Sequence, residues 1–222
     1  WVEGVYTGIE QALTKFGGEL LGGDCSTGKE KILAITAIGT LGKLRLHRSK
    51  ALDGDFLIAS GPHGLSRLGL ALLLNDSQVN TFELPEGLKT KAIRTHQRPN
   101  PPIAALRALE ASKPKELPWR AAGTDSSDGL LEAVQSICNS SQCQAILDTN
   151  KLPRDQDWPL GGSWNAWCMS GGEDFELIAS LPPSWAKAFL KIYPNGKIIG
   201  IIQSGPPEII WSDGEKISKL DF

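Results

Sequence analysis

The chain has 222 residues, of which 41% are hydrophobic and 22% are charged, and its formal net charge is -2. These proportions are those of a globular protein and exclude a disordered, collagen-like or coiled-coil chain. The charge balance lacks the basic excess that draws a whole chain to nucleic acid, so we expect no nucleic-acid partner. No apolar run approaches the roughly 20 residues that cross a bilayer, so we expect no membrane partner.

The cysteine content indicates the cellular compartment. Four cysteines in 222 residues are too sparse for a disulfide scaffold, and they include no CxxC pair. Only three histidines are present to complete a zinc site. Reduced thiols fit this pattern best, and we therefore expect a cytoplasmic protein. The cysteines are Cys25, Cys138, Cys143 and Cys168.

The first segment has the pattern of an amphipathic helix. Apolar residues recur at helical spacing from Val2 to Phe16, and two glycines follow. No capping residue precedes this pattern, so we expect the chain to be an N-terminally truncated part of a longer polypeptide. Beyond the glycines, the sequence predicts a short strand over Glu19–Leu21 and a second strand over Lys31–Leu41, which is rich in isoleucine and threonine.

The middle of the chain alternates between apolar runs and turn residues. Asp55–Ser60 (DFLIAS) predicts a buried strand, and a glycine turn separates it from a helix running from Ser66 to about Leu74. Polar and proline-rich composition predicts loops over Asn75–Thr81 and Gln97–Pro102. Between Ile103 and Ala111 an alanine-rich segment predicts a helix.

The last hundred residues contain further joints between strands and helices. A strand over Ala121–Thr124 leads into a polar turn, after which the apolar residues from Leu130 to Cys138 follow one helical face. This alternation predicts an α/β protein with α+β mixed sheets. The remaining predictions are strands over Gln144–Leu147, Phe175–Ser180, Lys197–Ile202 and Glu208–Trp211, a tryptophan-rich loop over Asp155–Trp167 and a helix over Trp185–Tyr193.

Three turns combine glycine with acidic residues: GGD at Gly22–Asp24, DSSDG at Asp125–Gly129 and SGGED at Ser170–Asp174. Glycine lets backbone amides approach a phosphate closely, while a carboxylate at a strand end can reach a cation that bridges phosphate oxygens. Together the three turns indicate a metal–nucleotide site. Acidic glycine turns also occur as solvated loop tips, and that alternative stays open.

Asp125 and Asp128 lie three residues apart at the start of a predicted helix. This spacing allows both carboxylates to converge on one cation cluster while Ser127 meets a phosphate. The alternative is that Asp125 or Ser126 simply caps the helix. The P-loop, protein-kinase and dinucleotide-binding motifs are all absent, so any phosphoryl transfer requires another architecture.

Basic and aromatic side chains could assist such a site. Arg48 and the group Arg94, His96 and Arg98 could neutralise phosphate charge, although exposed basic residues usually bind nothing specific. A planar ring could stack on tryptophans of the 155–167 segment, or these side chains could cover a core. The tryptophans are Trp158, Trp164 and Trp167.

With GGD, DSSDGL and SGGEDFEL in this order, the chain resembles the thiamine-monophosphate kinase family of the aminoimidazole-ribonucleotide-synthetase-like superfamily. The resemblance covers nearly the whole chain. It implies ATP-dependent phosphorylation of thiamine monophosphate to thiamine diphosphate, with Mg²⁺ as cofactor and a homodimeric intact protein. By the same resemblance, Gly23, Asp24, Arg48 and Ser127 would contact ATP.

The resemblance also implies the metal and substrate ligands. Asp24, Asp125 and Asp128 would hold magnesium, and Glu173 would touch the thiamine substrate. No residue is singled out as catalytic, because the attacking phosphate oxygen is already ionised at neutral pH and needs no general base. The main obstacle is the approach of two anions, which metals and an arginine reduce.

The resemblance implies a division of the chain as well. Residues 1–45 would be the end of a first, ATP- and metal-binding dimerisation domain, and residues 46–222 a complete second α/β domain. The family carries further sequence ahead of GGD, so we expect the 222-residue chain alone to have little or no kinase activity. Two alternatives stay open: a non-catalytic fragment that binds nucleotide, and another enzyme of the same ATP-binding superfamily.

Overall fold

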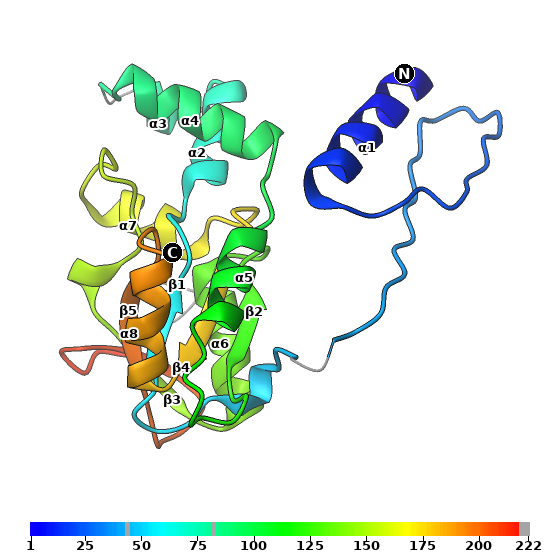
Figure 1. The fold of residues 1–222 in the computed structure, drawn as a ribbon. Helices are drawn as coiled ribbons and strands as arrows, with labels where there is room; N and C mark the ends of the chain where they lie inside the picture. The colour runs from blue at the N-terminus through cyan, green and yellow to red at the C-terminus, as the bar shows by residue number, and fades with distance from the viewer. Residues whose placement is uncertain (43–44, 81–82, 218–222) are drawn as a thin grey trace. The chain divides into compact units, whose positions relative to one another are not determined.

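The computed structural model describes residues 1–42, 45–80 and 83–217 (Figure 1). The chain divides into two compact units, Trp1–Gly42 and Lys43–Phe222. The first unit contains helix α1 (Val2–Phe16), which confirms the predicted opening helix. The helix ends at Gly17, whose φ of 88° favours glycine and whose amide donates to the Leu13 carbonyl at 2.8 Å.

The two strands predicted in the first unit are wrong. Glu19–Leu21 and Lys31–Leu41 form no strand in the described part of this unit. Isoleucine and threonine raise β propensity, but a strand forms only when its backbone pairs with another strand. The described residues of the first unit provide no such pairing, and most apolar side chains of the segment 32–41 are exposed.

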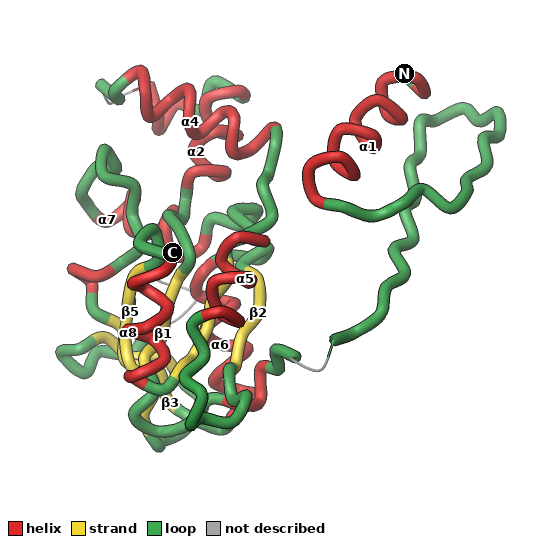
Figure 2. Tube along the Cα trace, viewed as in Figure 1, coloured by secondary structure: helices red, strands yellow, loops and turns green. Residues whose placement is uncertain are grey.

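The second unit is built on a six-stranded mixed sheet, whose strands are yellow in Figure 2. The strand order is β2-β4-β1-β5-β3-β6. All neighbouring strands are antiparallel except β3 and β6, which are parallel. Each predicted strand of this unit is confirmed, with ends that differ by at most two residues. The strands are β1 (Phe56–Ala59), β2 (Ala122–Asp125), β3 (Gln144–Leu147), β4 (Leu177–Leu181), β5 (Lys197–Gln203) and β6 (Ile209–Trp211).

Helices pack on both faces of this sheet. Along β1, Leu57 and Ala59 join the core beneath α6 (Leu130–Ser141), whereas Ile58 joins the opposite core. That second core contains side chains of α5 (Ile103–Ala111) and α8 (Pro183–Ile192), two helices that lie on the same face in Figure 1. This alternation is the period of two expected of a strand buried on both sides. The α/β fold class with a mixed sheet is therefore confirmed.

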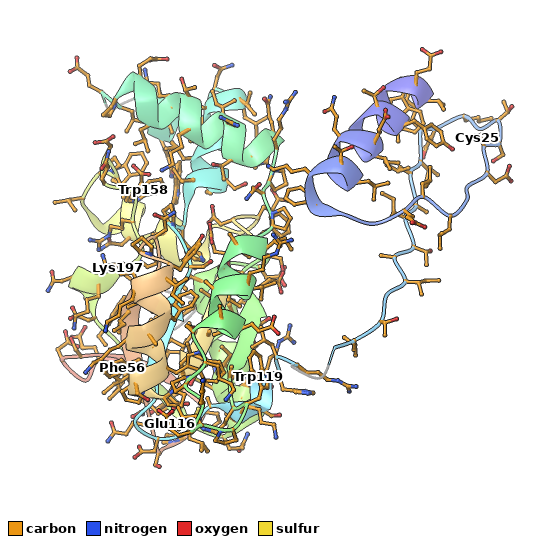
Figure 3. The ribbon with its side chains drawn as sticks, viewed as in Figure 1. Cys25, Phe56, Glu116, Trp119, Trp158 and Lys197 are labelled. Atoms are coloured by element: carbon orange, nitrogen blue, oxygen red, sulfur yellow. The ribbon has the colours of Figure 1, made fainter. Side chains whose placement is uncertain are left out.

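A third cluster of apolar side chains lies beyond the end of β1. It joins α2 (Leu65–Leu73) and α4 (Glu86–Gln97), and Trp158 and Trp164 are buried in it. Trp158, labelled in Figure 3, lies against the start of α2, since a Cβ atom added to Gly64 would lie 2.8 Å from its ring. Of the two interpretations of these tryptophans, stacking on a planar ring or covering a core, the structure shows Trp158 and Trp164 in a core.

Two local predictions in this region need correction, and one helix was not predicted. Helix α4 was not predicted, because only two of its twelve residues are buried and its apolar periodicity is weak. The loop predicted over Asp155–Trp167 ends early, since α7 (Gly162–Ser170) begins within it. The loop predicted over Asn75–Thr81 contains the short helix α3 (Ser77–Asn80), and Thr81 lies outside the described residues. Two 3₁₀ turns, η1 (Arg48–Lys50) and η2 (Thr149–Lys151), complete the unit.

Candidate functional site

The DSSDG turn joins β2 directly to α6. Strand β2 ends at Asp125, and both Asp125 and Asp128 are exposed, whereas Ser126 is buried. The N-cap of α6 is Gly129, with a φ of 99° and no side-chain capping bond. The alternative that Asp125 or Ser126 caps this helix is therefore wrong, and the two exposed carboxylates remain available for another role.

The SGGED turn packs against the DSSDG turn through backbone atoms. The Glu173 amide donates to the Ser127 carbonyl at 2.7 Å. A Cβ atom added to Gly172 would lie 2.7 Å from the same carbonyl oxygen, so any side chain there would force the turns apart. Gly171 is equally confined, because its Cβ would lie 2.4 Å from the Trp167 carbonyl oxygen. The glycines thus bring Ser127 and Glu173 together.

A buried histidine is hydrogen-bonded to the DSSDG turn. His63 is fully buried; its Nδ1 lies 3.1 Å from the Gly61 carbonyl and its Nε2 lies 2.9 Å from Ser126 Oγ. Because a carbonyl only accepts, Nδ1 carries the proton and Nε2 accepts from the serine hydroxyl. The Ser126 hydroxyl in turn accepts from the Glu176 amide at 3.0 Å. Burial lowers the pKa of His63 to about 4, so the ring is neutral at pH 7.

This histidine predicts a loss of stability in acid. In the unfolded chain His63 binds a proton below its ordinary pKa of 6.5, whereas in the folded chain it does so only near pH 4. Stability is therefore lost as the pH falls from about 6.5 to about 4, by about 3 kcal/mol for this group. Thermal midpoints measured across this range should fall less steeply for His63→Gln than for the unsubstituted protein. The exposed His47→Gln variant is the matched control, and equal slopes for all three proteins would contradict this role of His63.

Asp174, the last residue of the SGGED turn, is buried, and Glu176, two residues later, is half-buried. The Asp174 carboxylate accepts from the amides of Gly64 at 2.7 Å and Ser66 at 3.0 Å, and burial raises its pKa to about 7. Glu176 accepts from the Ser60 hydroxyl, and burial raises its pKa as well. Sequence reasoning assigned no role to these acids or to His63. The SGGEDFEL motif contains both acids, but nothing in the sequence distinguishes these two from exposed Glu173.

Arg48 lies beside the end of β2. Its Nε donates to Thr124 Oγ1 at 3.2 Å, and that hydroxyl donates in turn to Asp125 Oδ1 at 3.4 Å. The Arg48 carbonyl accepts from the Ser141 hydroxyl at 2.6 Å, which fastens η1 to the end of α6. The structure therefore brings the predicted phosphate ligand Arg48 close to the predicted metal ligand Asp125.

Glu173 projects its side chain outward from an uncommon backbone conformation. Its φ is 65°, and its side chain is 62% exposed. Its Oε2 lies 3.5 Å from Nδ1 of His96 on α4, and the same nitrogen lies 3.0 Å from Ser66 Oγ. Left-handed backbone at a non-glycine residue marks a position that the surrounding contacts hold in place. Of the basic group predicted at 94–98, His96 is thus the member found against a predicted site residue.

Gly23 and Asp24 belong to the first unit. Both are exposed, and the Asp24 carboxylate accepts from the Cys25 amide at 2.8 Å. Their approach to Asp125 and Asp128 therefore stays a prediction. Within residues 1–42, 45–80 and 83–217, no group of three or more His, Cys, Asp or Glu side chains is arranged to hold a metal ion. Searched over the same residues, none of the helices has the length and apolar character needed to span a membrane.

Proteins of known function resemble the chain over nearly its whole length. It is 60% identical to thiamine-monophosphate kinase of Prochlorococcus marinus over 219 residues, which cover 99% of the chain and 66% of that protein. It is 38% identical to thiamine-monophosphate kinase of Synechococcus elongatus, covering all of the chain and 67% of that protein. The chain thus spans about two thirds of the length of these relatives. No protein-family model matches it.

Solved structures share the fold. The crystal structure of thiamine-monophosphate kinase from Stenotrophomonas maltophilia matches with a TM-score of 0.63 and 24% identity, over 79% of the chain and 55% of that protein. A ThiL protein complexed with AMPPCP and TMP matches with a TM-score of 0.60 and 24% identity, over 78% of the chain and 52% of that protein. The matches to the Prochlorococcus and Synechococcus proteins span nearly the whole chain, including the segments of all three acidic glycine turns, and the chain belongs to the thiamine-monophosphate kinase family.

Proposed function

We propose that the protein transfers the terminal phosphoryl group of ATP to thiamine monophosphate and so forms thiamine diphosphate. The observation that carries the proposal is the backbone hydrogen bond of 2.7 Å from the Glu173 amide to the Ser127 carbonyl, which joins the SGGED and DSSDG turns. The names of the close relatives support this activity. So does the ThiL complex, in which an ATP analogue and TMP are bound by one protein of the same fold.

The ATP side of the site is proposed to comprise Arg48, Ser127, Gly23 and Asp24. The Arg48 guanidinium carries a permanent positive charge in a planar fork, a shape that suits phosphate oxygens. Ser127 offers a hydroxyl from a turn whose backbone is held by the neighbouring SGGED turn. Gly23 has no side chain, so a phosphate could approach its amide closely.

Mg²⁺ is proposed to bind the carboxylates of Asp125 and Asp128, with Asp24 as a third ligand. Carboxylate oxygens are the donors that this hard cation prefers, and it binds through one or two of them together with substrate phosphates. Two exposed carboxylates on one turn fit that requirement. When bound, the ion neutralises negative charge on the transferring phosphoryl group.

The protein's own side chains then have limited tasks. The acceptor is an ionised phosphate oxygen of thiamine monophosphate, so no side chain has to remove a proton. Arg48 offsets the charge between the two phosphate-bearing substrates. Glu173 would hold the thiamine part of the acceptor, whose thiazolium ring is cationic, with a carboxylate side chain that is 62% exposed. Positioning and charge stabilisation are the main contributions in phosphoryl transfer, and this residue set provides both.

The wider setting is proposed to follow the family. Residues 1–45 would be the end of an N-terminal domain and residues 46–222 the second domain, a division supported by the break between compact units after Gly42. The protein would act as a cytoplasmic homodimer, with no nucleic-acid or membrane partner. The free state of all four cysteines supports a reducing compartment.

The proposed function is tested by a substrate panel. The complete polypeptide is incubated with ATP, Mg²⁺ and either thiamine monophosphate or thiamine, and the products are separated by chromatography. We expect thiamine diphosphate from the monophosphate and no phosphorylated product from thiamine. Nucleotide binding without either product would favour the non-catalytic alternative, and turnover only with an unrelated acceptor would favour another enzyme of the superfamily.

A further inference from the structure

We propose that Asp174 is a positioning residue that holds Glu173 in place for the thiamine substrate. The inference rests on the proposed function and concerns a residue that contacts neither substrate. Its basis is the Asp174 carboxylate, which joins the SGGED turn to the start of α2. The two segments are more than a hundred residues apart in the sequence.

The contact between Asp174 and α2 has the geometry of a helix cap supplied from another segment. Gly64, the N-cap residue of α2, has no side chain with which to accept from the first amides of the helix. The Asp174 carboxylate accepts from two of these donors, at 2.7 Å from the Gly64 amide and 3.0 Å from the Ser66 amide. A negative charge at a helix N-terminus is also favoured by the helix dipole.

Gly64 cannot be replaced by a residue that carries its own cap. Its φ is 89°, and a Cβ atom added to it would lie 2.8 Å from the Trp158 ring. A capping serine or aspartate is therefore excluded at this position by both backbone conformation and space. Asp174 is the acceptor that the structure provides instead, and only 6% of it is exposed.

Glu173 is consequently fixed on both sides. Its own amide donates to the Ser127 carbonyl, while the side chain of the next residue is fastened to α2. Between these two attachments the backbone adopts a φ of 65°, a conformation that is unfavourable for glutamate in a free chain. Loss of the Asp174 carboxylate would release one attachment, so Glu173 would spend less time in the orientation that meets the substrate.

His96 gives the same arrangement a third point of contact. The Ser66 amide donates to Asp174, the Ser66 hydroxyl lies 3.0 Å from Nδ1 of His96, and that nitrogen lies 3.5 Å from the Glu173 carboxylate. Asp174, Ser66 in the first turn of α2 and His96 on α4 thus form one series of contacts that ends at the Glu173 carboxylate. A residue that acted only on overall stability would need no such connection to the substrate ligand.

The test is a double-mutant cycle on the kinase reaction of the complete polypeptide. Asp174→Asn keeps the shape of the side chain but replaces one accepting oxygen by an NH₂ donor. One of the two backbone amides that face Asp174 then has no acceptor. We expect the KM for thiamine monophosphate to rise about tenfold in Asp174→Asn, while kcat changes less than about threefold, because one accepting oxygen that fastens the turn is lost and no group of the chemical step is. In a Glu173→Gln background, the same replacement should raise the KM less than about twofold, because residues that act together are not additive.

Controls separate this role from a structural one. Asp148→Asn removes another carboxylate that accepts a backbone amide, at the N-cap of η2, and should leave both kinetic constants unchanged. If Asp174→Asn does not fold, Asp174→Ser retains one capping acceptor without charge and should still raise the KM. An unchanged KM, or a tenfold rise that persists in the Glu173→Gln background, would overturn the inference. Failure of the unsubstituted protein to phosphorylate thiamine monophosphate would instead overturn the proposed function on which it rests.

Discussion

Replacement of Asp128 by asparagine should lower kcat of the kinase reaction by about 10² to 10³, the usual cost of removing one group that stabilises developing charge. The side chain is exposed on the turn between β2 and α6, and α6 has no capping bond from it. Its removal should therefore leave the fold intact while depriving Mg²⁺ of a ligand. Initial rates at saturating Mg²⁺, together with the thermal midpoint, measure both effects.

Asp213→Asn is the matched control for this substitution. Asp213 is also an exposed aspartate of a turn, and it follows β6 rather than β2. We expect its kcat to equal that of the unsubstituted protein. If Asp128→Asn keeps near-normal turnover at saturating Mg²⁺, Asp128 is only a polar turn residue and is not a metal ligand.

Replacement of Arg120 by alanine should lower the free energy of unfolding by about 3 to 5 kcal/mol, because it leaves a buried carboxylate without its cation. The Arg120 guanidinium contacts both carboxylate oxygens of Asp55 at 2.7 Å, and the Asp55 side chain is only 2% exposed. The Ser180 hydroxyl and the Leu52 amide also donate to this carboxylate, but neither carries charge. Urea unfolding followed by tryptophan fluorescence measures the loss.

Arg107→Ala on the exposed side of α5 provides the comparison, and it should change the unfolding free energy by less than about 0.5 kcal/mol. Removal of both charges, in Arg120→Ala combined with Asp55→Ala, should be less damaging than the sum of the two single substitutions. A loss below about 1 kcal/mol in Arg120→Ala would show that the two neutral donors alone satisfy Asp55.

The sheet of the second unit could be predicted because its strands are short apolar runs bounded by turn residues. DFLIAS and KIIGII are bounded in this way, and both are central strands of the sheet. Helix α6 was equally accessible, since its apolar residues at helical spacing are the buried ones. Strand order was not predictable, because pairing depends on contacts between residues far apart in the sequence.

The errors have the same origin. Lys31–Leu41 has the composition of a strand but no pairing partner in the described part of its unit. Helix α4 has a largely polar sequence, and it is packed against α2 at a point where Gly69 allows close approach: a Cβ there would lie 2.2 Å from the Ala92 carbonyl oxygen. The lack of a pairing strand for the first segment and the packing on α2 for the second thus outweighed their local signals.

The turns of the candidate site could be predicted from their glycines and acids, but the buried polar side chains that contact these turns could not. Asp125, Ser127, Asp128 and Glu173 lie on recognisable turns, and the structure shows that these turns touch. The buried polar groups behind them carry no such signal. His63 lies within the glycine turn between β1 and α2, and the hydrogen bond of its neutral ring to Ser126 becomes apparent only in the folded structure.

The central claim is that the DSSDG turn binds the metal and the SGGED turn binds the thiamine substrate. Crystallography of the complete polypeptide with AMPPCP, thiamine monophosphate and Mn²⁺ in place of Mg²⁺ tests it most directly. Mn²⁺ prefers the same oxygen ligands and has an anomalous signal that locates it without ambiguity. We predict an anomalous peak within about 2 to 2.5 Å of a carboxylate oxygen of Asp125 or Asp128, consistent with direct coordination of such cations. Thiamine monophosphate should lie against the Glu173 carboxylate. Metal and substrate bound away from residues 125–129 and 170–174 would contradict the account.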